Sequence, residues 1–179
     1  MEREDKIVTG IFLGLGTNED DRVENLKMAL TLINEEVGDI TALSGVYETD
    51  PWGFESSNRF LNMVANVTTR LVPAALLKKT QEIEKKLGRV RSQVRFSSRS
   101  MDVDILLFGN RVINQRKLTV PHPLIPERRF VLVPLCDLIP GRIHPVLKQT
   151  FSELLIQCRD TGNVSRTEIS LELPGKRKG

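Results

Sequence analysis

The sequence lacks the features that mark membrane and secreted proteins. Its uninterrupted apolar runs, such as Ile105–Phe108, are only a few residues long, whereas a membrane-spanning helix needs about 20 consecutive apolar residues. The first residues, Met1 to Lys6, are almost all charged and contain no apolar stretch of the kind found in a secretion signal. These absences argue against both classes, and we expect the protein to be cytoplasmic.

Cysteine is equally scarce. The chain has only two, Cys136 and Cys158, and they do not form a Cys-x-x-Cys pair. A zinc site or a disulfide framework is therefore nearly excluded, and both residues are expected to be buried thiols. With 179 residues, 40% apolar and 27% charged, the chain is expected to form a single domain that buries a substantial core.

The familiar nucleotide-binding motifs are also missing. The sequence contains no Gly-x-x-x-x-Gly-Lys-Ser/Thr P-loop and no glycine-rich kinase loop. Gly14 and Gly16 follow a predicted strand, but the third glycine of a dinucleotide fingerprint is absent, so we reject a Rossmann domain. Aromatic residues make up only 5% of the chain, without the signature of an RRM. A net charge of +3 is too small to define a nucleic-acid-binding protein.

What the sequence does contain is an alternation of strand and helix patterns. Apolar and β-branched residues bounded by turn residues predict four strands, at 8–15, 40–47, 60–69 and 101–108. Apolar residues at helical spacing predict a helix from about Val23 that stops at Gly38, and another from Pro73 to Leu87. The β-α-β-β-α-β order matches the ferredoxin-like plait, an α+β fold with an antiparallel sheet and two helices on one face.

The remainder of the chain is expected to add smaller elements to this plait. The sequence predicts a hairpin over about 112–119, a helix that starts near Pro126, and a last helix over about 150–158. We expect the core to cover about residues 8–158 and residues 159–179 to form a C-terminal tail that is loosely held from Gly162 onward. The connection over 48–59 is too long for a hairpin turn and is expected to be functional or mobile.

Two carboxylates in the last predicted strand of the plait suggest a metal site. Asp102 and Asp104 are two residues apart, so in a strand both side chains leave the same face, with Cα atoms roughly 6.5–7 Å apart. Mg²⁺ typically binds through one or two carboxylates together with substrate phosphates. The alternative is that both aspartates pair with nearby arginines on a solvated face.

The segment before these aspartates is strongly basic. Between Lys78 and Arg99 there are eight Lys and Arg residues and two Glu, a local charge of +6. Guanidinium groups bind phosphate oxygens bidentately, so a basic loop leading into a carboxylate pair is typical of a site that positions a metal-bound polyphosphate for transfer. The alternatives are a solvated basic loop and a patch that binds RNA. The arginines in the loop are Arg89, Arg91, Arg95 and Arg99.

The roles of two arginines and one histidine near the end of the predicted core are open from the sequence. His122 lies between two prolines, where its imidazole could face a phosphate or cap the loop. Arg128 and Arg129 are expected in the first turn of the helix that starts near Pro126, where backbone amides favour anions. For Arg129 a surface ion pair is the preferred interpretation, and Arg128 is left open. His144 is expected to be structural.

A series of motifs occurs in a consistent order and spacing. They are GLGTN at 14–18, YETDPWG at 47–53, FLN at 60–62, QEIE at 81–84, RSMDVDILLF at 99–108, LTVPHP at 118–123 and ERRFVLVPL at 127–135. Together they resemble the 6-hydroxymethyl-7,8-dihydropterin pyrophosphokinase family of folate biosynthesis, over about residues 8 to 158. The resemblance implies ATP-dependent transfer of a pyrophosphoryl group to the hydroxymethyl oxygen of the pterin, with release of AMP.

The resemblance also implies roles for residues on the nucleotide side. Asp102 and Asp104 would bind two Mg²⁺ ions that bridge the ATP phosphates and the attacking hydroxyl. Arg89 and Arg99 correspond to arginines of a flexible loop that clamps the triphosphate, and with the two aspartates they form the catalytic set. The other nucleotide-binding residues that the resemblance implies are Gln81, Glu84, Arg91, Arg95, Thr119, His122 and Arg128.

On the pterin side, Phe60 and Phe130 correspond to two aromatic walls that sandwich the ring, although the residues alone would place both in the core. A flat heterocycle is suited to stacking combined with a few directed polar groups. Asn62 and Thr49 correspond to its hydrogen-bond partners. The substrate-binding residues that the resemblance implies are Thr49, Asp50, Trp52, Phe60, Asn62 and Phe130. Phe96 and Ser98 depart from the family pattern, which often has Trp and Pro there.

The sequence thus predicts a monomeric pyrophosphokinase that uses Mg²⁺, ATP and the pterin, and that binds neither nucleic acid nor membrane. The rival hypothesis is a non-catalytic module that binds RNA or another polyanion through the same basic stretch. Salt-sensitive RNA binding without metal dependence would favour the rival. A catalytically inactive relative is a third possibility, weakened because Arg89, Arg99, Asp102 and Asp104 are all present.

Overall fold

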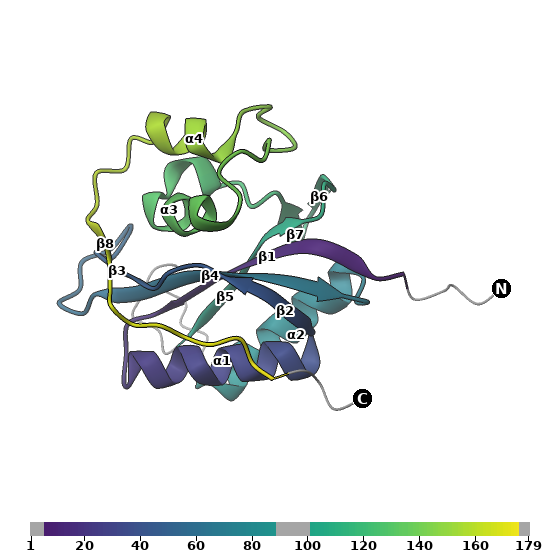
Figure 1. Ribbon diagram of the computed structural model, residues 1–179, viewed down its shortest axis with the longest axis horizontal. Helices are drawn as coiled ribbons and strands as arrows, with labels where there is room; N and C mark the ends of the chain where they lie inside the picture. Colours follow the sequence, from purple (N-terminus) through teal and green to yellow (C-terminus); the bar gives the residue numbers. More distant parts are fainter. Residues whose placement is uncertain (1–5, 89–100, 176–179) are drawn as a thin grey trace.

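An antiparallel sheet built from strands along the whole chain forms the centre of the structure (Figure 1). The computed structural model describes residues 6–88 and 101–175. The sheet contains β1 (Val8–Thr17), β2 (Gly38–Leu43), β3 (Tyr47–Thr49), β4 (Phe60–Thr69), β5 (Asp102–Phe108) and β8 (Val164–Arg166), and a separate hairpin contains β6 (Ile113–Gln115) and β7 (Leu118–Val120). The helices are α1 (Arg22–Glu36), α2 (Pro73–Lys86), α3 (Arg129–Leu138) and α4 (Phe151–Gln157), with a 3-10 turn η1 (Ile125–Glu127).

The strand order is β5-β1-β4-β3-β8, and β2 also pairs with β4. The order β1-α1-β2-β4-α2-β5 along the chain therefore confirms the predicted ferredoxin-like plait. In the antiparallel register of β1 and β5, Gly16 lies opposite Asp102 and Gly14 lies opposite Asp104. Each of the two aspartates thus faces a position on the neighbouring strand that has no side chain.

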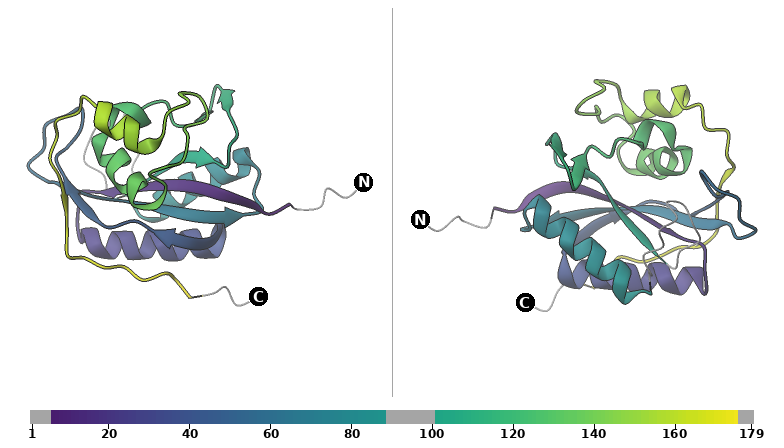
Figure 2. Two further views of the ribbon diagram at one scale, coloured as in Figure 1. Left: turned by 45° about the horizontal axis from the view of Figure 1, so that its top comes forward. Right: turned by 180° about the vertical axis from the view of Figure 1, so that it is seen from behind.

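Helices cover both faces of the sheet (Figures 1 and 2). α1 and α2 cover one face, where Leu26 and Ile83 belong to an apolar cluster that includes Leu13 of β1. α3 and α4 cover the opposite face, where Phe12, the neighbour of Leu13, packs in a second cluster with Leu132 of α3. This alternation along β1 is the pattern of a strand buried on both faces. Among the described residues, no helix combines the length and the apolar character that crossing a bilayer requires.

The turn from α1 into β2 follows the predicted helix stop. Asp21 caps the start of α1, because its side chain accepts a hydrogen bond from the backbone N–H of Glu24, a typical N-cap. At Gly38 a Cβ atom would lie 2.0 Å from the backbone oxygen of Thr68 on β4. Only glycine permits this close approach of the first residue of β2 to β4, so the chain can enter the sheet two residues after the helix ends.

The strand predicted over 40–47 is wrong in one respect, because it is interrupted. β2 ends at Leu43 and β3 begins at Tyr47, and both pair with β4. Between them, the Ser44 hydroxyl accepts a hydrogen bond from Val64 N at 2.8 Å, and Gly45 N donates to Asp137 Oδ2 on α3 at 2.9 Å. Ser44 N still donates to Val64 O at 2.9 Å, but the next N–H, that of Gly45, goes to a helix instead of a strand, so regular pairing is interrupted here.

The expectation of a loosely held tail is also wrong for the part up to Gly175, whereas Lys176 to Gly179 lie outside the described residues. Residues 159–175, which we call the C-terminal strap, pass from α4 around the edge of the sheet to the α1 side (Figures 1 and 2). On the way β8 pairs with β3, and Ile169 and Leu171 pack against the apolar cluster below the sheet. Near its end, Asn34 Nδ2 of α1 donates to the backbone oxygen of Gly175 at 3.0 Å. The strap is therefore part of the fold.

Candidate active site

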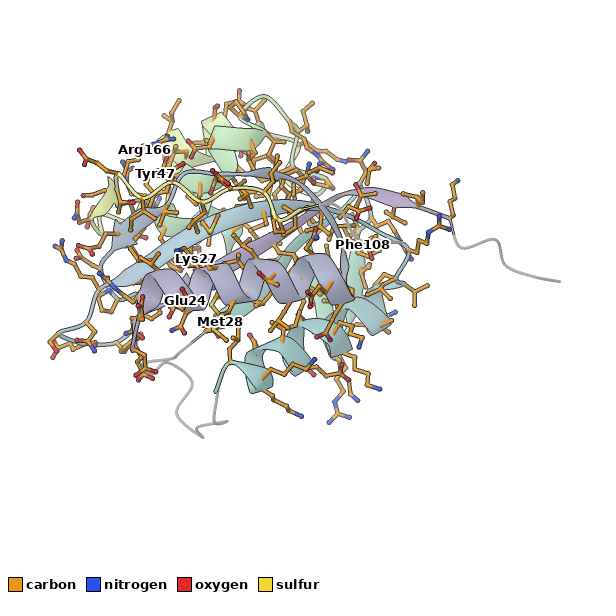
Figure 3. The ribbon with its side chains drawn as sticks, turned by 60° about the horizontal axis from the view of Figure 1, so that its bottom comes forward. Glu24, Lys27, Met28, Tyr47, Phe108 and Arg166 are labelled. Atoms are coloured by element: carbon orange, nitrogen blue, oxygen red, sulfur yellow. The ribbon has the colours of Figure 1, made fainter. Side chains whose placement is uncertain are left out.

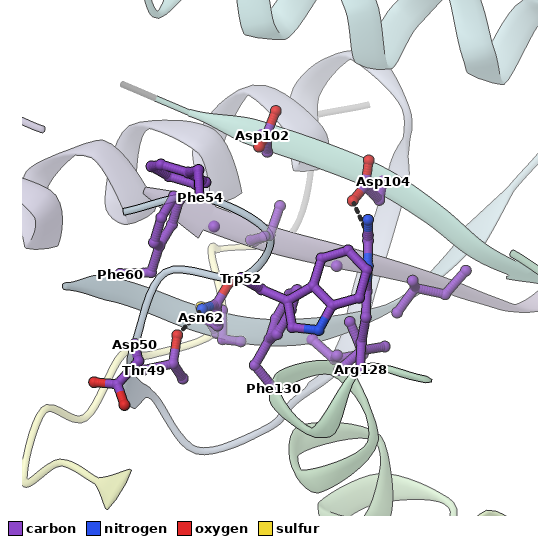
Figure 4. Close-up of a pocket in the computed structure, with 17 residues that line it drawn as sticks. Thr49, Asp50, Trp52, Phe54, Phe60, Asn62, Asp102, Asp104, Arg128 and Phe130 are labelled. Atoms are coloured by element: carbon purple, nitrogen blue, oxygen red, sulfur yellow. Dashed lines mark hydrogen bonds and ion pairs between the residues drawn. The ribbon is translucent and has the colours of Figure 1, made fainter. Parts of the chain in front are cut away.

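A pocket opens between the sheet and the N-terminal end of α3 (Figure 4). At one side it has an acidic end, formed by Asp102 and Asp104, and Arg128 extends from the start of α3 towards Asp104. The other side, which we call the aromatic end, is lined by Thr49, Asp50, Trp52, Phe54, Phe60, Asn62 and Phe130. All six substrate-binding residues expected from the sequence therefore line one pocket with both aspartates.

A buried amide organises the polar part of the aromatic end. Asn62 of β4 donates through Nδ2 to Thr49 Oγ1 of β3 at 2.6 Å, and only 7% of its surface is exposed. An asparagine side chain has two N–H donors and one acceptor, so the bond to Thr49 fixes the amide plane. A Cβ atom at Gly16 would lie 2.6 Å from Asn62 Oδ1. Glycine at position 16 therefore makes room for this side chain.

Aromatic rings form the walls around that amide. Phe54 contacts Phe60 edge to face, with ring centroids 6.0 Å apart, and Trp52 lies 6.5 Å from Phe130. The Arg128 guanidinium lies 4.6 Å from the Trp52 ring centre and 5.7 Å from that of Phe130. The loop after β3 therefore folds over the pocket, and Figure 4 shows the Trp52 indole between Phe130 and the acidic end.

The acidic end is built on β5 and supported from below the sheet. Asp102 and Asp104 both line the pocket, because alternate residues of a strand share a face. Val103, between them, has its side chain in the opposite apolar cluster. Its backbone N–H donates to Oε1 of Glu84 at 2.9 Å. Glu84 is buried on α2 and does not line the pocket. Its hydrogen bond to Val103 helps to position β5.

The donor set at the acidic end fits a metal that is shared with a phosphate. Within residues 6–88 and 101–175, no three His, Cys, Asp or Glu side chains are grouped so that they could hold a metal by themselves. Mg²⁺ is commonly bound by one or two carboxylates, with substrate phosphates and water completing its oxygen ligands. Two neighbouring aspartates on one strand face correspond to that kind of site.

Arg128 connects the two ends of the pocket. Its side chain is 12% exposed, and Nη1 lies 4.0 Å from Asp104 Oδ2. The prediction that it belongs to the first helical turn is wrong, because α3 begins at Arg129 and Arg128 has extended backbone angles, with φ −119° and ψ 97°. The preceding η1 turn ends at Glu127. The short extended step between η1 and α3 brings the guanidinium over the pocket instead of along a helix axis.

His122 lies beside this arginine at the end of β7. Its Nδ1 accepts a hydrogen bond from the backbone N–H of Leu124 at 3.2 Å, so the imidazole caps the loop. Burial, together with the positive charge of Arg128, lowers the pKa of His122 from 6.5 to about 4. The side chain is therefore neutral at pH 7, and in that state its proton is on Nε2 because Nδ1 is an acceptor.

The other expected site residues are placed less closely to the pocket. Gln81 lies on α2, three residues before Glu84, and Thr119 is exposed on β7, and neither lines the pocket. His144 is buried, and its Nδ1 accepts hydrogen bonds from the backbone N–H groups of Val146 and Leu147, which confirms a structural role. The residues that fall outside the described ranges are Arg89, Arg91, Arg95, Phe96, Ser98 and Arg99.

Some pocket residues were not found from the sequence. Gly14 and Gly16 line the pocket opposite the aspartates, but the sequence placed them only in a motif of the family resemblance and gave them no role in the site. Phe54 lies in the loop after β3 and packs on Phe60. The signal for the glycines was their two-residue spacing, which matches that of Asp102 and Asp104. It becomes informative only when the pairing of β1 with β5 is known.

Comparison with known proteins identifies the family. Residues 12–140 match the family model described as 7,8-dihydro-6-hydroxymethylpterin-pyrophosphokinase. A 2-amino-4-hydroxy-6-hydroxymethyldihydropteridine pyrophosphokinase of Aquifex aeolicus is 38% identical over 143 residues, which cover 80% of this chain and 88% of that protein. The protein of the same name from Bacillus subtilis is 44% identical over 128 residues, which cover 71% of this chain and 76% of that protein.

Solved structures agree on the fold. A Plasmodium falciparum HPPK-DHPS chain, crystallised with pterin and p-hydroxybenzoate, has a TM-score of 0.68 at 20% identity. The match covers 88% of this chain and 42% of that chain, so this chain spans less than half of the two-part protein. Another HPPK-DHPS structure, in complex with substrates, has a TM-score of 0.70 at 17% identity. The fold, the matched residues and the identities to the curated relatives together show that the chain belongs to the 7,8-dihydro-6-hydroxymethylpterin-pyrophosphokinase family.

Proposed function

We propose that this chain transfers the pyrophosphoryl group of ATP to the hydroxymethyl oxygen of 6-hydroxymethyl-7,8-dihydropterin, in folate biosynthesis, and that the two ends of the pocket divide the work. Membership of the family and the names of the curated relatives support the reaction. The division is supported by one observation above all. A single pocket contains a flat, aromatic-walled slot with a buried amide and, next to it, a pair of carboxylates.

The aromatic end suits a flat heterocycle with donors and acceptors on its rim. Phe60 and Phe130 both line this end, and we propose that they stack on the two faces of the ring, as the family resemblance implies; such stacking is worth about 0.5–1.5 kcal/mol beyond area burial. The Asn62 amide, held by Thr49, can read the rim of the ring by hydrogen bonds in a direction fixed before binding. In this proposal the slot is rigid before the pterin binds, so its side chains lose little conformational entropy on binding.

The acidic end suits the polyphosphate. Asp102 and Asp104 would hold Mg²⁺, which when bound neutralises the negative charge of the phosphates and orients them for in-line attack. Arg128, from the opposite wall, would bind phosphate oxygens and so move away from the Trp52 ring. Arg89 and Arg99, together with Arg91 and Arg95, lie outside the described residues, and we propose the clamping role that the family resemblance implies for the first two.

In the reaction, the pterin hydroxyl oxygen gives up its proton to water and forms a bond to the β-phosphorus of ATP, while the bond from that phosphorus to the α–β bridging oxygen breaks and AMP leaves with that oxygen. Such transfers need positioning and charge stabilisation rather than a covalent protein intermediate. The pocket provides both, because its aromatic end fixes the nucleophile and its acidic end and Arg128 fix the phosphates. The neutral His122 imidazole can donate one Nε2–H hydrogen bond without adding charge.

We make further proposals on the number of Mg²⁺ ions, the oligomeric state and the remaining nucleotide-binding residues. Asp102 and Asp104 lie on the same face of β5, and a triphosphate bound against that face could be held by two Mg²⁺ ions rather than one. We further propose that one chain forms the whole site, since both ends of the pocket come from the same chain. On that basis a monomer in the cytoplasm, with no nucleic-acid partner, would be sufficient for activity. We also propose a role of Gln81 and Thr119 in nucleotide binding, as the family resemblance implies.

The test is a product analysis. Purified protein is incubated with ATP, Mg²⁺ and the reduced hydroxymethylpterin, and the nucleotides are separated. We expect AMP and the pterin diphosphate in equal amounts, with no AMP when the pterin or the Mg²⁺ is omitted. Formation of ADP instead would mean transfer of a single phosphoryl group, and salt-sensitive RNA binding without any nucleotide turnover would support the non-catalytic rival.

A further inference from the structure

The C-terminal strap contacts the wall of the aromatic end that is formed by the loop after β3. The backbone N–H of Asp50 donates to the backbone oxygen of Asn163 at 3.2 Å. In return, the backbone N–H of Asn163 donates to Asp50 Oδ2 at 3.1 Å. A small cavity behind the pocket is bounded by both segments, by Thr49 to Trp52 on one side and by Asp160 and Gly162 to Val164 on the other. The strap therefore supports this loop directly.

The strap also contacts the opposite wall, at the start of α3. The N-cap residue of this helix is Arg128, which provides no capping side chain. Instead, the backbone N–H of Arg129 donates to Asp160 Oδ2 at 3.0 Å, while Oδ1 of the same carboxylate accepts from Gly162 N at 2.9 Å. A carboxylate at a helix N-terminus satisfies an orphan donor and complements the helix dipole. Asp160 thus caps α3 from a distant part of the chain.

Contacts on either side of β8 fix the strap in place. Beyond Asp160, β8 pairs with β3, and Thr167 N donates to Val46 O at 2.9 Å. Arg166 lies beside Tyr47 (Figure 3), with its Nη1 3.3 Å from the tyrosine hydroxyl and 3.6 Å from Asp137 Oδ1 on α3. A segment held in this way is a rigid support, so a change at Asp160 would be felt at the pocket rather than absorbed by a loose tail.

We propose that Asp160 is a positioning residue for the pterin. The residue that precedes Arg129 is Arg128 and the one that follows it is Phe130, so the capped N–H lies between two residues of the pocket. Asp160 fixes the position of the Phe130 ring through α3, while Asn163 fixes the loop that carries Asp50 and Trp52. This inference rests on the proposed function. The strap lies beyond the residues 12–140 that match the family model, so the match assigns it no role.

The experiment compares steady-state kinetics of the full-length protein with those of two variants at this position. Asp160→Ala removes the cap and is expected to raise the KM for the pterin about five- to tenfold, since an N-cap bond is worth about that factor in an equilibrium constant. The KM for ATP and kcat should change by less than about twofold. Asp160→Asn keeps an oxygen that can cap the helix, so it should restore most of the pterin KM.

The matched control is Thr150→Ala. Thr150 caps α4 by accepting a hydrogen bond from Glu153 N, and α4 lies in the same layer as α3 but contributes no residue to the pocket. This variant should lose thermal stability as Asp160→Ala does, without the rise in pterin KM. The contrast separates a lost helix cap in general from the loss of this cap in particular.

Each outcome decides one question. If the wild-type protein forms no pterin-dependent AMP, the proposed function fails before Asp160 is considered. If the wild type is active but Asp160→Ala keeps the wild-type pterin KM, or raises the KM of ATP equally, the positioning role is overturned. A rise in pterin KM that also occurs in Thr150→Ala would overturn it as well, since general loosening of the helical layer would then be the cause.

Discussion

The two ends of the pocket are built in different ways. At the aromatic end, the protein satisfies its own polar groups, since Asn62 binds Thr49 and the strap binds Asp50 and caps α3. At the acidic end, Asp102 and Asp104 lie on one strand face, Asp104 is 44% exposed, and Arg128 approaches it only to 4.0 Å. The first end is held by hydrogen bonds within the protein, whereas the second brings two carboxylates onto one strand face, where bound cations would stabilise them further.

This difference separates binding from chemistry. A preorganised slot contributes to affinity, because little entropy is lost when the ring enters. A site that brings carboxylates to a metal and to the phosphates contributes mainly in the transition state, where negative charge is redistributed. Changes at the acidic end should therefore appear in kcat, and changes at the aromatic end in the KM of the pterin.

The largest effect is expected at the acidic end. Asp102→Asn and Asp104→Asn each remove a charge while keeping the shape of the side chain, and each should lower the rate of AMP formation by about 10³-fold or more. Pterin affinity, measured by calorimetry, should change little. Asp39→Asn on β2, which is exposed and distant from the pocket, is the control. Loss of less than tenfold in either site variant would contradict the assignment.

A somewhat smaller effect is expected for the basic segment. Arg99→Ala should cost about 2.7–4 kcal/mol of transition-state stabilisation if its guanidinium faces developing phosphate charge, measured as kcat/KM for ATP. The control is Lys78→Ala, because the Lys78 side chain is 80% exposed on α2. Equal, small losses in both variants would show that Arg99 only adds to the general positive charge of this region.

We expect His122, which lies beside Arg128, to lower the free energy of unfolding in acid. Its pKa is lowered from 6.5 to about 4 in the fold, so unfolding takes up a proton below pH 6.5, and stability present above that pH is lost as the pH falls towards 4. At pH 5 this loss is about 2 kcal/mol. Urea unfolding at pH 8 and pH 5 should show this difference between wild type and His122→Gln, and parallel behaviour would contradict it.

The smallest effect is expected at Gly16. In Gly16→Ala the new Cβ would approach Asn62 Oδ1 to 2.6 Å, so the amide must shift, and the KM of the pterin should rise about tenfold as one directed hydrogen bond is lost. Gly141→Ala is the matched control, because a Cβ there would meet no atom within 4 Å. A rise in the KM of ATP alone would reverse our assignment of the two ends.

Most of the plait could be predicted from the sequence, because its elements carry strong local signals. Helical spacing and Pro73 indicated α2, and β-branched residues indicated β4, which runs from Phe60 to Thr69 as expected. β8 could not be predicted, because its residues, Val164 to Arg166, are mostly polar and become a strand only by pairing with β3. The break after Leu43 was missed for a similar reason, since its cause is the Asp137 side chain on α3.

The candidate site shows the same limit. The family resemblance indicated that Phe60 and Phe130 belong to the pocket. Their apolar character alone would have placed both in the core. It did not indicate that Glu84 binds the backbone between the two aspartates, because that contact depends on how α2 packs below β5. The cap that Asp160 provides for α3 joins residues 31 apart in sequence. Such contacts follow from the assembled fold, and no short pattern encodes them.

The position of Trp52 has a practical consequence. It is the only tryptophan of the chain and lies in the pocket against a guanidinium. The tryptophan fluorescence of the protein therefore comes from this pocket alone. We expect the emission spectrum to change when a nucleotide draws Arg128 away or when a pterin binds beside the indole. The native protein thus carries a built-in optical probe with which the order of ligand arrival can be followed without any attached dye.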